Sequence, residues 1–427
     1  MHTPRRSRRL AEKSEATSST NLSVEPSRIR RKPRQLLGPA SELGKHARQS
    51  WEEKHNKEKE LASQPSITQA TRNLGWSLLQ LVAGQADAAV LSPISVIIAI
   101  AMLAGAADSH RQSQLHQKLG VTESLEADIS TLYTSLTPLA RQDLISLANA
   151  VFVDQSVELA PIYKKYLESF QAHSQNFLSL PDSAKDINSW ISKNTRGQIN
   201  GLLSSRALRN SHVVLVNTTA FRGAWKTKFD PANTVPKYSF CLENGIIRET
   251  EMMFLYNKYI ETASSSNCTA VRLSYTTGSG SSPSALVAWL PNPGVPVGSL
   301  LEDFSTKQPG SLAFRRSKLS KFGFPKFNSR SKISLLNELE RLGFPIKGNY
   351  PAMGSGPTEV TAILHETFVK VDEEGAEAAA ATAILVPRKR PKVIKEEVLV
   401  FDRPFLYMIE AGEYRHTIIC GVFSVPE

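Results

Sequence analysis

Residues Val371 to Ile384 read Val-Asp-Glu-Glu-Gly-Ala-Glu-Ala-Ala-Ala-Ala-Thr-Ala-Ile, and this stretch decides how the rest of the chain is interpreted. It ends a strand-like run that starts at Val360, and the basic segment Pro387-Arg388-Lys389-Arg390-Pro391 follows soon after it. Ala has the highest helix propensity, but Gly375 precedes the alanines and the β-branched Thr382 follows them. We therefore expect an exposed segment that can later enter between two strands, where only small side chains fit.

The size and composition favour one large folded unit of mixed type. The chain has 427 residues, of which 41% are hydrophobic, so it can bury a sizeable core. Helical patterns cluster early, whereas residues 213–221, 360–371 and most of the C-terminal stretch are strand-like, which predicts an α+β fold. The longest apolar stretch, Ile94 to Ala107, is too short to span a membrane and is typical of a buried helix.

The first 65 residues differ from the rest of the chain. They are rich in Ser, Arg, Lys and Glu, so we expect residues 1–65 to be a disordered charged extension and residues 66–427 to form the domain. This extension has no apolar stretch of signal-peptide type, which predicts a cytoplasmic or nuclear protein. A different start of the chain would instead allow an extracellular one.

Positive charge is concentrated in that extension. Residues 1–34 hold ten Lys or Arg and three Glu, a net +7 of the +11 carried by the whole chain. Two clusters, Arg5 to Arg9 and Arg28 to Arg34, fit either a nuclear-import or polyanion-binding segment or an ordinary solvated tail. Residues 5–34 are thus the candidate contact for nucleic acid or another polyanion.

The sequence lacks the motifs of common catalytic and metal sites. No G-x-S-x-G, P-loop or H-E-x-x-H motif occurs, and no His and Cys cluster has metal-site spacing. The three cysteines, Cys241, Cys268 and Cys420, are too few and too scattered for a disulfide framework. We therefore predict a protein that is not an enzyme and that uses no metal or cofactor.

Several further motifs occur in a fixed order along the chain. They are Leu91-Ser92-Pro93-Ile94-Ser95, Asn188-Ser189-Trp190-Ile191, Thr195-Arg196-Gly197-Gln198-Ile199, Leu215 to Trp225, Phe324-Pro325-Lys326-Phe327, Leu339-Glu340-Arg341-Leu342-Gly343 and Asp402-Arg403-Pro404-Phe405-Leu406-Tyr407. Together with Val371 to Ile384, they resemble motifs of the serpins, the serine protease inhibitor family. The resemblance covers about residues 66–427. It implies a metastable serpin fold, in which a large central β-sheet carries helices and a reactive loop at about residues 373–397 is exposed.

The resemblance also implies roles for residues outside the loop. The hydrogen-bonded cluster that controls opening of the central sheet is matched by Ser92, Ser95, Asn217 and His365. Lys326 and Glu373 match a charge pair at the top of the sheet, and Trp225 matches the aromatic residue packed beneath it. Ordinary packing is the alternative for each of these residues, and none is expected to be catalytic.

For an inhibitory member, the resemblance implies a suicide-substrate mechanism. A target protease attacks the loop and forms an acyl-enzyme, and the cut loop then inserts into the central sheet before water completes hydrolysis. Insertion needs small residues at the leading end of the new strand, and Ala376 and Ala378 to Ala381 meet that demand. The hinge implied by the resemblance comprises Glu373, Glu374, Gly375, Ala376, Glu377, Ala378, Ala379, Ala380, Ala381 and Thr382. The expected protein is a monomer that does not bind membranes.

The basic segment of the loop predicts the class of target. The family spacing of fourteen residues past Gly375 places the scissile bond at Lys389–Arg390, and Arg388–Lys389 is the alternative. Either bond puts a cation in the specificity pocket, so the expected target is a trypsin-like protease. One departure is that eleven residues, Arg390 to Val400, separate Lys389 from Phe401, a few more than the family implies.

Two other functions fit the same resemblance. The first is a nuclear or chromatin-associated serpin that uses its basic extension, with Arg388 to Lys392 as an added localisation signal. The second is a non-inhibitory serpin, which would be cleaved without trapping the protease and without gaining stability.

Overall fold

The computed structural model describes one folded unit, which starts at residue 66. The described ranges are 66–84, 88–121, 125–177, 181–209, 211–278, 283–307, 312–375 and 397–426. The predicted extension, residues 1–65, and residues 376–396 of the expected loop lie outside them.

Most of the described helices come before residue 210. The α-helices are α2 (Ser66–Ala83), α3 (Pro93–Ala104), α4 (Ser109–Leu119), α5 (Leu125–Arg141), α6 (Pro161–Glu168), α7 (Pro181–Asn194), α8 (Ser205–Leu208), α9 (Val297–Lys307) and α10 (Leu335–Arg341), and the 3-10 helices are η1 (Pro231–Asn233) and η2 (Pro351–Met353). Ser92 caps the N-terminus of α3, where its Oγ accepts a hydrogen bond from the Ser95 amide over 3.4 Å, and Pro93 fits the first turn. Every residue of α3 is buried, so the apolar stretch does form a buried helix.

The larger of the two main sheets has nine strands among the described residues. In spatial order they are β1 (Ala88–Leu91), β16 (His416–Phe423), β15 (Phe405–Ala411), β9 (Ser284–Pro291), β8 (Cys268–Ser274), β7 (Ile247–Ser264), β10 (Arg315–Pro325) and β14 (Val398–Val400), with β6 (Thr234–Cys241) paired to β7. Strand β14 pairs in parallel with β10, and the Ser320 amide donates to the Glu397 carbonyl over 2.9 Å. The chain therefore returns to this sheet directly after the loop.

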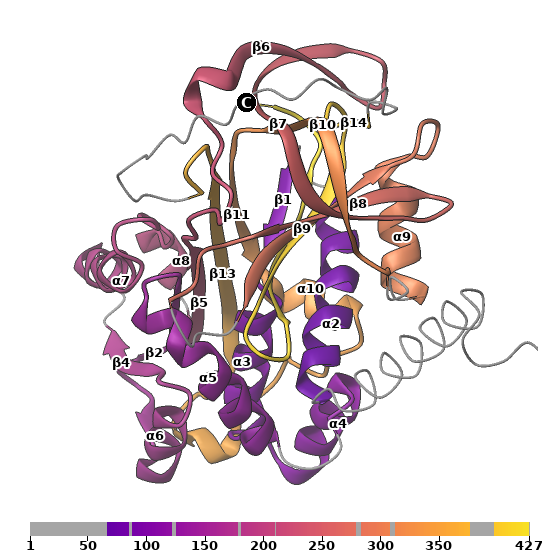
Figure 1. The fold of residues 1–427 in the computed structure, drawn as a ribbon. Helices are drawn as coiled ribbons and strands as arrows, with labels where there is room; N and C mark the ends of the chain where they lie inside the picture. The colour runs from indigo at the N-terminus through magenta and orange to yellow at the C-terminus, as the bar shows by residue number, and fades with distance from the viewer. Residues whose placement is uncertain are drawn as a thin grey trace, which may run out of the picture. The chain divides into compact units, whose positions relative to one another are not determined.

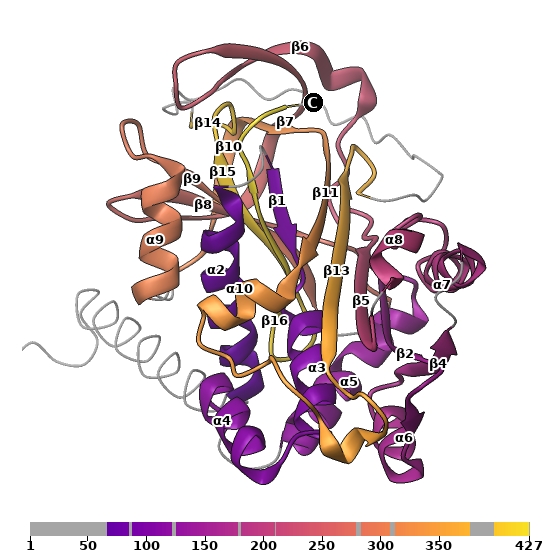
Figure 2. The same ribbon diagram turned by 180° about the vertical axis from the view of Figure 1, so that it is seen from behind.

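The second sheet runs down the middle of the views in Figures 1 and 2. Its strands, in spatial order, are β11 (Phe327–Ser334), β13 (Val360–Val371), β5 (Val213–Phe221), β2 (Ile145–Asp154) and β4 (His173–Phe177). Strands β13 and β5 are parallel, whereas β11 is antiparallel to β13 and β2 is antiparallel to β5. We call the boundary between β5 and β13 the seam. A small third sheet pairs β12 (Gly354–Ser355) with β3 (Glu158–Leu159).

Both faces of the second sheet are covered. Along β5, Val213 and Leu215 belong to the main core, while Val214 and Val216 pack in a separate cluster with Ile187 of α7. This alternation follows from the two-residue period of a strand. Every residue of β5 is buried, which explains why its sequence is a continuous apolar and threonine-rich run. The helices before residue 210 and the two main sheets confirm the predicted α+β fold.

Candidate functional site

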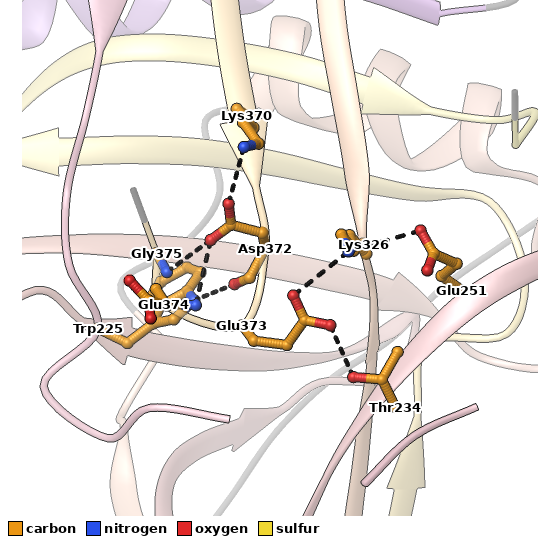
Figure 3. Close-up of polar contacts among 9 residues, drawn as sticks. All are labelled: Trp225, Thr234, Glu251, Lys326, Lys370, Asp372, Glu373, Glu374 and Gly375. Carbon is orange, nitrogen blue, oxygen red and sulfur yellow. Dashed lines mark hydrogen bonds and ion pairs between the residues drawn. The ribbon is translucent and has the colours of Figure 1, made fainter. Parts of the chain in front are cut away.

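The carboxyl end of β13 is held by a group of contacts that we call the end cluster, formed by residues 372–375 with Trp225, Phe229, Thr234 and Lys326. The Trp225 indole Nε1 donates to the Asp372 carbonyl over 2.7 Å, and its backbone amide donates to the Glu374 carbonyl over 2.9 Å (Figure 3). The Phe229 amide donates to the Glu373 carbonyl over 3.0 Å. The Trp225 ring is itself fixed by stacking on Tyr275, with centroids 4.5 Å apart. The start of the predicted hinge is thus bonded to the chain that leaves β5.

Glu373 lies at the centre of the charged contacts in this cluster. One of its carboxylate oxygens is 3.4 Å from the Lys326 ammonium, and the other accepts a hydrogen bond from the Thr234 hydroxyl over 2.8 Å (Figure 3). Lys326 also approaches Glu251 at 3.6 Å. Burial acts to lower the pKa of Lys326, but the charges of Glu373 and Glu251 outweigh it, and the pKa is raised. Lys326 therefore remains a cation between two carboxylates.

Gly375 is required at the end of the cluster by its conformation and by its surroundings. Its φ is +95°, a region that side chains disfavour, and an added Cβ would lie 2.2 Å from the Gly223 carbonyl oxygen. The Asp372 carboxylate accepts hydrogen bonds from the Glu374 and Gly375 amides over 3.1 Å and 3.0 Å. This local turn begins to direct the chain away from β13.

Halfway along the seam, three polar side chains lie directly opposite one another on neighbouring strands. Asn149 of β2 is paired in register with Asn217 of β5, and Asn217 is paired with His365 of β13. The Asn217 amide Nδ2 donates to Asn149 Oδ1 over 2.8 Å. We call these three residues the central row. All three are buried.

His365 connects this row to the buried helix α3. Its Nε2 accepts a hydrogen bond from the Ser92 backbone amide over 3.0 Å and lies 3.0 Å from the Thr367 hydroxyl. Burial lowers the pKa of His365 to about 4, although the backbone carbonyl of Asn217 acts weakly in the opposite direction. Because a backbone amide can only donate, the neutral ring accepts at Nε2 and carries its proton on Nδ1.

Some atoms of the central row have no hydrogen-bond partner within the described ranges. They are the Asn217 Oδ1 and His365 Nδ1 atoms, which belong to residues paired across the seam. The Ser95 Oγ atom on α3 is also buried without a partner among the described residues. Buried polar groups are normally hydrogen-bonded, so unpaired ones lower the stability of the sheet at this point.

The structure brings the predicted site residues that it describes into two places. Ser92, Ser95, Asn217 and His365 meet at the seam, although Ser95 contributes through its backbone amide. Trp225, Lys326, Glu373, Glu374 and Gly375 meet in the end cluster. The rest of the hinge (Ala376, Glu377, Ala378, Ala379, Ala380, Ala381 and Thr382), Arg388, Lys389, Arg390 and the basic residues 5–34 lie outside the described residues.

The sequence did not single out six residues that contribute to these contacts: Asn149, Phe229, Thr234, Glu251, Thr367 and Asp372. An Asn in the apolar strand β2 is a usable signal, because a buried amide needs a partner. Thr234 gave no such signal, because it lies 139 residues before Glu373 in the sequence.

Two other kinds of feature are absent from the described residues. They contain no group of three or more His, Cys, Asp or Glu side chains placed to hold a metal ion. Nor do they include a helix with the length and apolar character needed to cross a membrane. The end cluster and the central row, at the top and the middle of the seam, are the candidate functional site.

Comparison with known proteins points to one family. Residues 69–426 match the family model described as Serpin (serine protease inhibitor). Serpin-Z7 of Hordeum vulgare is 29% identical over 374 residues, covering 81% of this chain and 92% of the relative. Glia-derived nexin of Homo sapiens is 28% identical over 360 residues, covering 80% and 88%. The solved native stressed conformation of an Arabidopsis serpin, AtSerpin1, aligns with a TM-score of 0.70 and 23% identity over 84% of this chain and 98% of that one.

Proposed function

The chain belongs to the serpin family of serine protease inhibitors, and from that membership we propose that it traps an Arg- or Lys-specific serine protease as a covalent acyl-enzyme. The matching family is described as serine protease inhibitors, so the protein is a protease inhibitor and not an enzyme. What this proposal adds is the class of target and the suicide-substrate mechanism.

The observation that carries the proposal is the parallel pairing of β5 and β13 at the seam. Strand β13 runs directly into the hinge at Gly375, where the backbone has the φ of +95° that a reversal requires. A loop that turns back there would run antiparallel to β13, and therefore antiparallel to β5 as well. An opened seam thus offers two antiparallel hydrogen-bonding edges to one inserted strand.

The composition of the inserting segment supports the same mechanism. Strand β5 is buried on both faces, so a new neighbour would have to pack under the helices that cover the sheet. Ala378 to Ala381 satisfy that demand because methyl side chains need little space. Inhibition would be lost if large or charged residues stood there.

The chemical step is supplied by the protease. Its serine hydroxyl attacks the carbonyl carbon of the cleaved residue, the peptide bond breaks, and the new amine leaves with the proton delivered by the protease histidine. The ester that remains links the two proteins. Insertion then moves the ester carbonyl away from the donors that would stabilise its hydrolysis, so deacylation stalls.

The basic residues of the loop define the target class. Lys389 is our first choice for the cleaved residue and Arg388 the second, and both suit a specificity pocket with a carboxylate at its base. Pro391 makes cleavage after Arg390 unfavourable, so a protease that reads the pair Lys389-Arg390 and cuts after it fits less well.

The test is to mix the protein with trypsin at near-equimolar ratio and to separate the products on a denaturing gel. The proposal expects a detergent-stable band at the summed mass, and a released C-terminal fragment whose first residue is Arg390 or Lys389. The cleaved protein should also unfold only above roughly 90 °C. Complete cleavage with no such band and no gain in thermal stability would identify a non-inhibitory serpin.

A second candidate function rests on the basic extension. The net +7 of residues 1–34 favours binding to a polyanion such as DNA, and such binding should weaken steeply as salt rises. Deleting residues 1–34 should abolish retention on a DNA column while leaving trypsin trapping unchanged. Equal DNA binding by the shortened chain would remove this candidate.

A further inference from the structure

The central row does not end at Asn149 but continues into helix α5. The Asn149 amide Nδ2 donates to the Tyr133 hydroxyl over 3.3 Å, and that hydroxyl donates to the Phe170 carbonyl over 2.5 Å. Phe170 is a buried residue between α6 and β4. The hydrogen bonds thus run from a backbone carbonyl, through Tyr133 and Asn149, to Asn217 at the seam.

The direction of each hydrogen bond in this series is fixed by the one before it. A carbonyl can only accept, so the Tyr133 hydroxyl gives its proton to Phe170, and its oxygen is left to accept. Asn149 must then present Nδ2 to Tyr133, and its Oδ1 must face Asn217. Asn217 in turn presents Nδ2 to Asn149 and Oδ1 away from it.

A second series fixes the other side of the seam. The Ser92 amide can only donate, so His365 accepts at Nε2 and keeps a proton on Nδ1. Asn217 Oδ1 is an acceptor and His365 Nδ1 is a donor, on residues that are paired across the closed seam. Neither atom has a hydrogen bond of normal geometry among the described residues, but their polarities are complementary.

We propose that Tyr133 is a positioning residue that favours the closed seam, because its hydroxyl orients the amides of Asn149 and Asn217 so that Asn217 directs its acceptor Oδ1, and not its donor Nδ2, away from Asn149 on the side of the strand that carries His365. The inference rests on the proposed function, since opening of the seam is the step that admits the loop.

A cavity next to the Tyr133 hydroxyl increases the contribution of its hydrogen bond to the contact between α5 and β2. A cavity of about 300 Å³ lies beside α5 and β2, and Tyr133, Leu136, Leu147 and Asn149 are among the residues that line it. Apolar contact between the helix and the strand is therefore interrupted here. The hydrogen bond from Asn149 to Tyr133 connects the two elements at this interruption.

Loss of the Tyr133 hydroxyl should reverse the direction of the hydrogen bond between Asn149 and Asn217. In a Tyr133→Phe variant, Asn149 Nδ2 has no acceptor, and turning the amide over would bring Nδ2 towards Asn217. Asn217 would then accept from Asn149 and turn its own Nδ2 towards the seam. Two donors, Asn217 Nδ2 and His365 Nδ1, would face each other, and the closed seam would be less stable.

The experiment compares Tyr133→Phe with a matched control, Tyr163→Phe. The control also removes a hydroxyl that donates to a buried carbonyl, in this case Met102 over 3.0 Å, but it lies away from the seam. The readout is the rate at which the uncleaved protein takes up a synthetic peptide with the sequence of residues 376–388, followed on native gels. A second readout is the pair of side-chain amide resonances of Asn149 and Asn217 in Asn-labelled protein.

We expect Tyr133→Phe to take up the peptide about two to ten times faster than the wild type, which is the effect of one misoriented hydrogen bond. Both amide resonances should move in this variant and stay in place in the control. An unchanged or slower rate, unmoved resonances, or equal acceleration in Tyr163→Phe would overturn the proposal. Failure to trap trypsin would count only against the proposed function, because the peptide assay needs no protease.

Discussion

The end cluster and the central row lie along one seam, yet they are bonded in different ways. In the end cluster, the Trp225 indole, the Glu373 carboxylate and the Asp372 carboxylate all have partners at normal distances. In the central row, Asn217 Oδ1 and His365 Nδ1 are buried without a partner among the described residues. The seam is therefore held firmly where the hinge leaves β13 and weakly in its middle.

This difference suits a strand that must enter from one end. In the proposed mechanism, Trp225 and Phe229 would have to release three backbone carbonyls before the loop could enter, so firm bonding at Gly375 would oppose spontaneous insertion. The weaker bonding further down would then offer less resistance to the next step of insertion.

Removing the aromatic side chain of the end cluster should have the largest effect. A Trp225→Ala variant loses the stacking on Tyr275 and the indole hydrogen bond to Asp372, and it leaves a large void, so we expect a loss of about 3–5 kcal/mol. The urea midpoint of unfolding measures this. The partly buried Trp190, 5.2 Å from the His173 ring, provides a control, and an equal loss in Trp190→Ala would contradict the assignment.

Acid should weaken the central row. His365 has a pKa of about 4 in the fold against 6.5 in the unfolded chain, so the fold favours the neutral ring. Its contribution is complete above about pH 6.5 and is lost as the pH falls towards 4, and the full difference corresponds to roughly 3 kcal/mol. The thermal midpoint should therefore fall across this range.

A His365→Gln variant separates this contribution from that of His416, whose pKa is also lowered to about 4 by burial. We expect the variant to retain part of the acid sensitivity, with a clearly shallower slope between pH 6.5 and 4. Identical slopes for the variant and the wild type would show that His365 does not titrate in this way.

Breaking the charge pair of the end cluster should have an intermediate effect. Lys326→Met leaves the Glu373 carboxylate with the Thr234 hydroxyl but no cation, at a cost of roughly 1–3 kcal/mol. Lys237→Met breaks an exposed pair with Glu249 and should cost less than about 1 kcal/mol. Urea unfolding measures the free energy of unfolding of both variants. A larger loss of stability in Lys237→Met than in Lys326→Met would be inconsistent with a structural role for Lys326.

A pair of threonine substitutions should give the smallest effects and the sharpest comparison. Thr234→Val removes a hydrogen bond to Glu373 and should cost about 1 kcal/mol. The Thr219 hydroxyl on β5 is buried without a partner among the described residues, so Thr219→Val should be neutral or stabilising. If Thr219→Val were the more damaging change, the contrast between the two regions would be wrong.

The sequence alone predicted much of the fold. The strands expected at residues 213–221 and 360–371 coincide with β5 and β13, because both are long runs that a sheet buried on two faces requires. The buried helix at Ile94 was also predicted, because a continuous apolar run that begins with Pro in its first turn is typical of a helix buried on all sides. The α+β class and the family followed from motifs that the sequence shows in order.

Only the tertiary structure decided how the site residues are bonded. Nothing in the sequence indicates that Thr234 would share Glu373 with Lys326, because Thr234 begins β6, Lys326 lies between β10 and β11, and Glu373 lies in the turn after β13. The unpaired atoms of Asn217 and His365, and the series of hydrogen bonds from Phe170 through Tyr133, likewise depend on the register of three strands and the position of one helix. Local preferences determine which segments form strands and helices, whereas the direction of a buried hydrogen bond depends on partners that only the folded chain brings together.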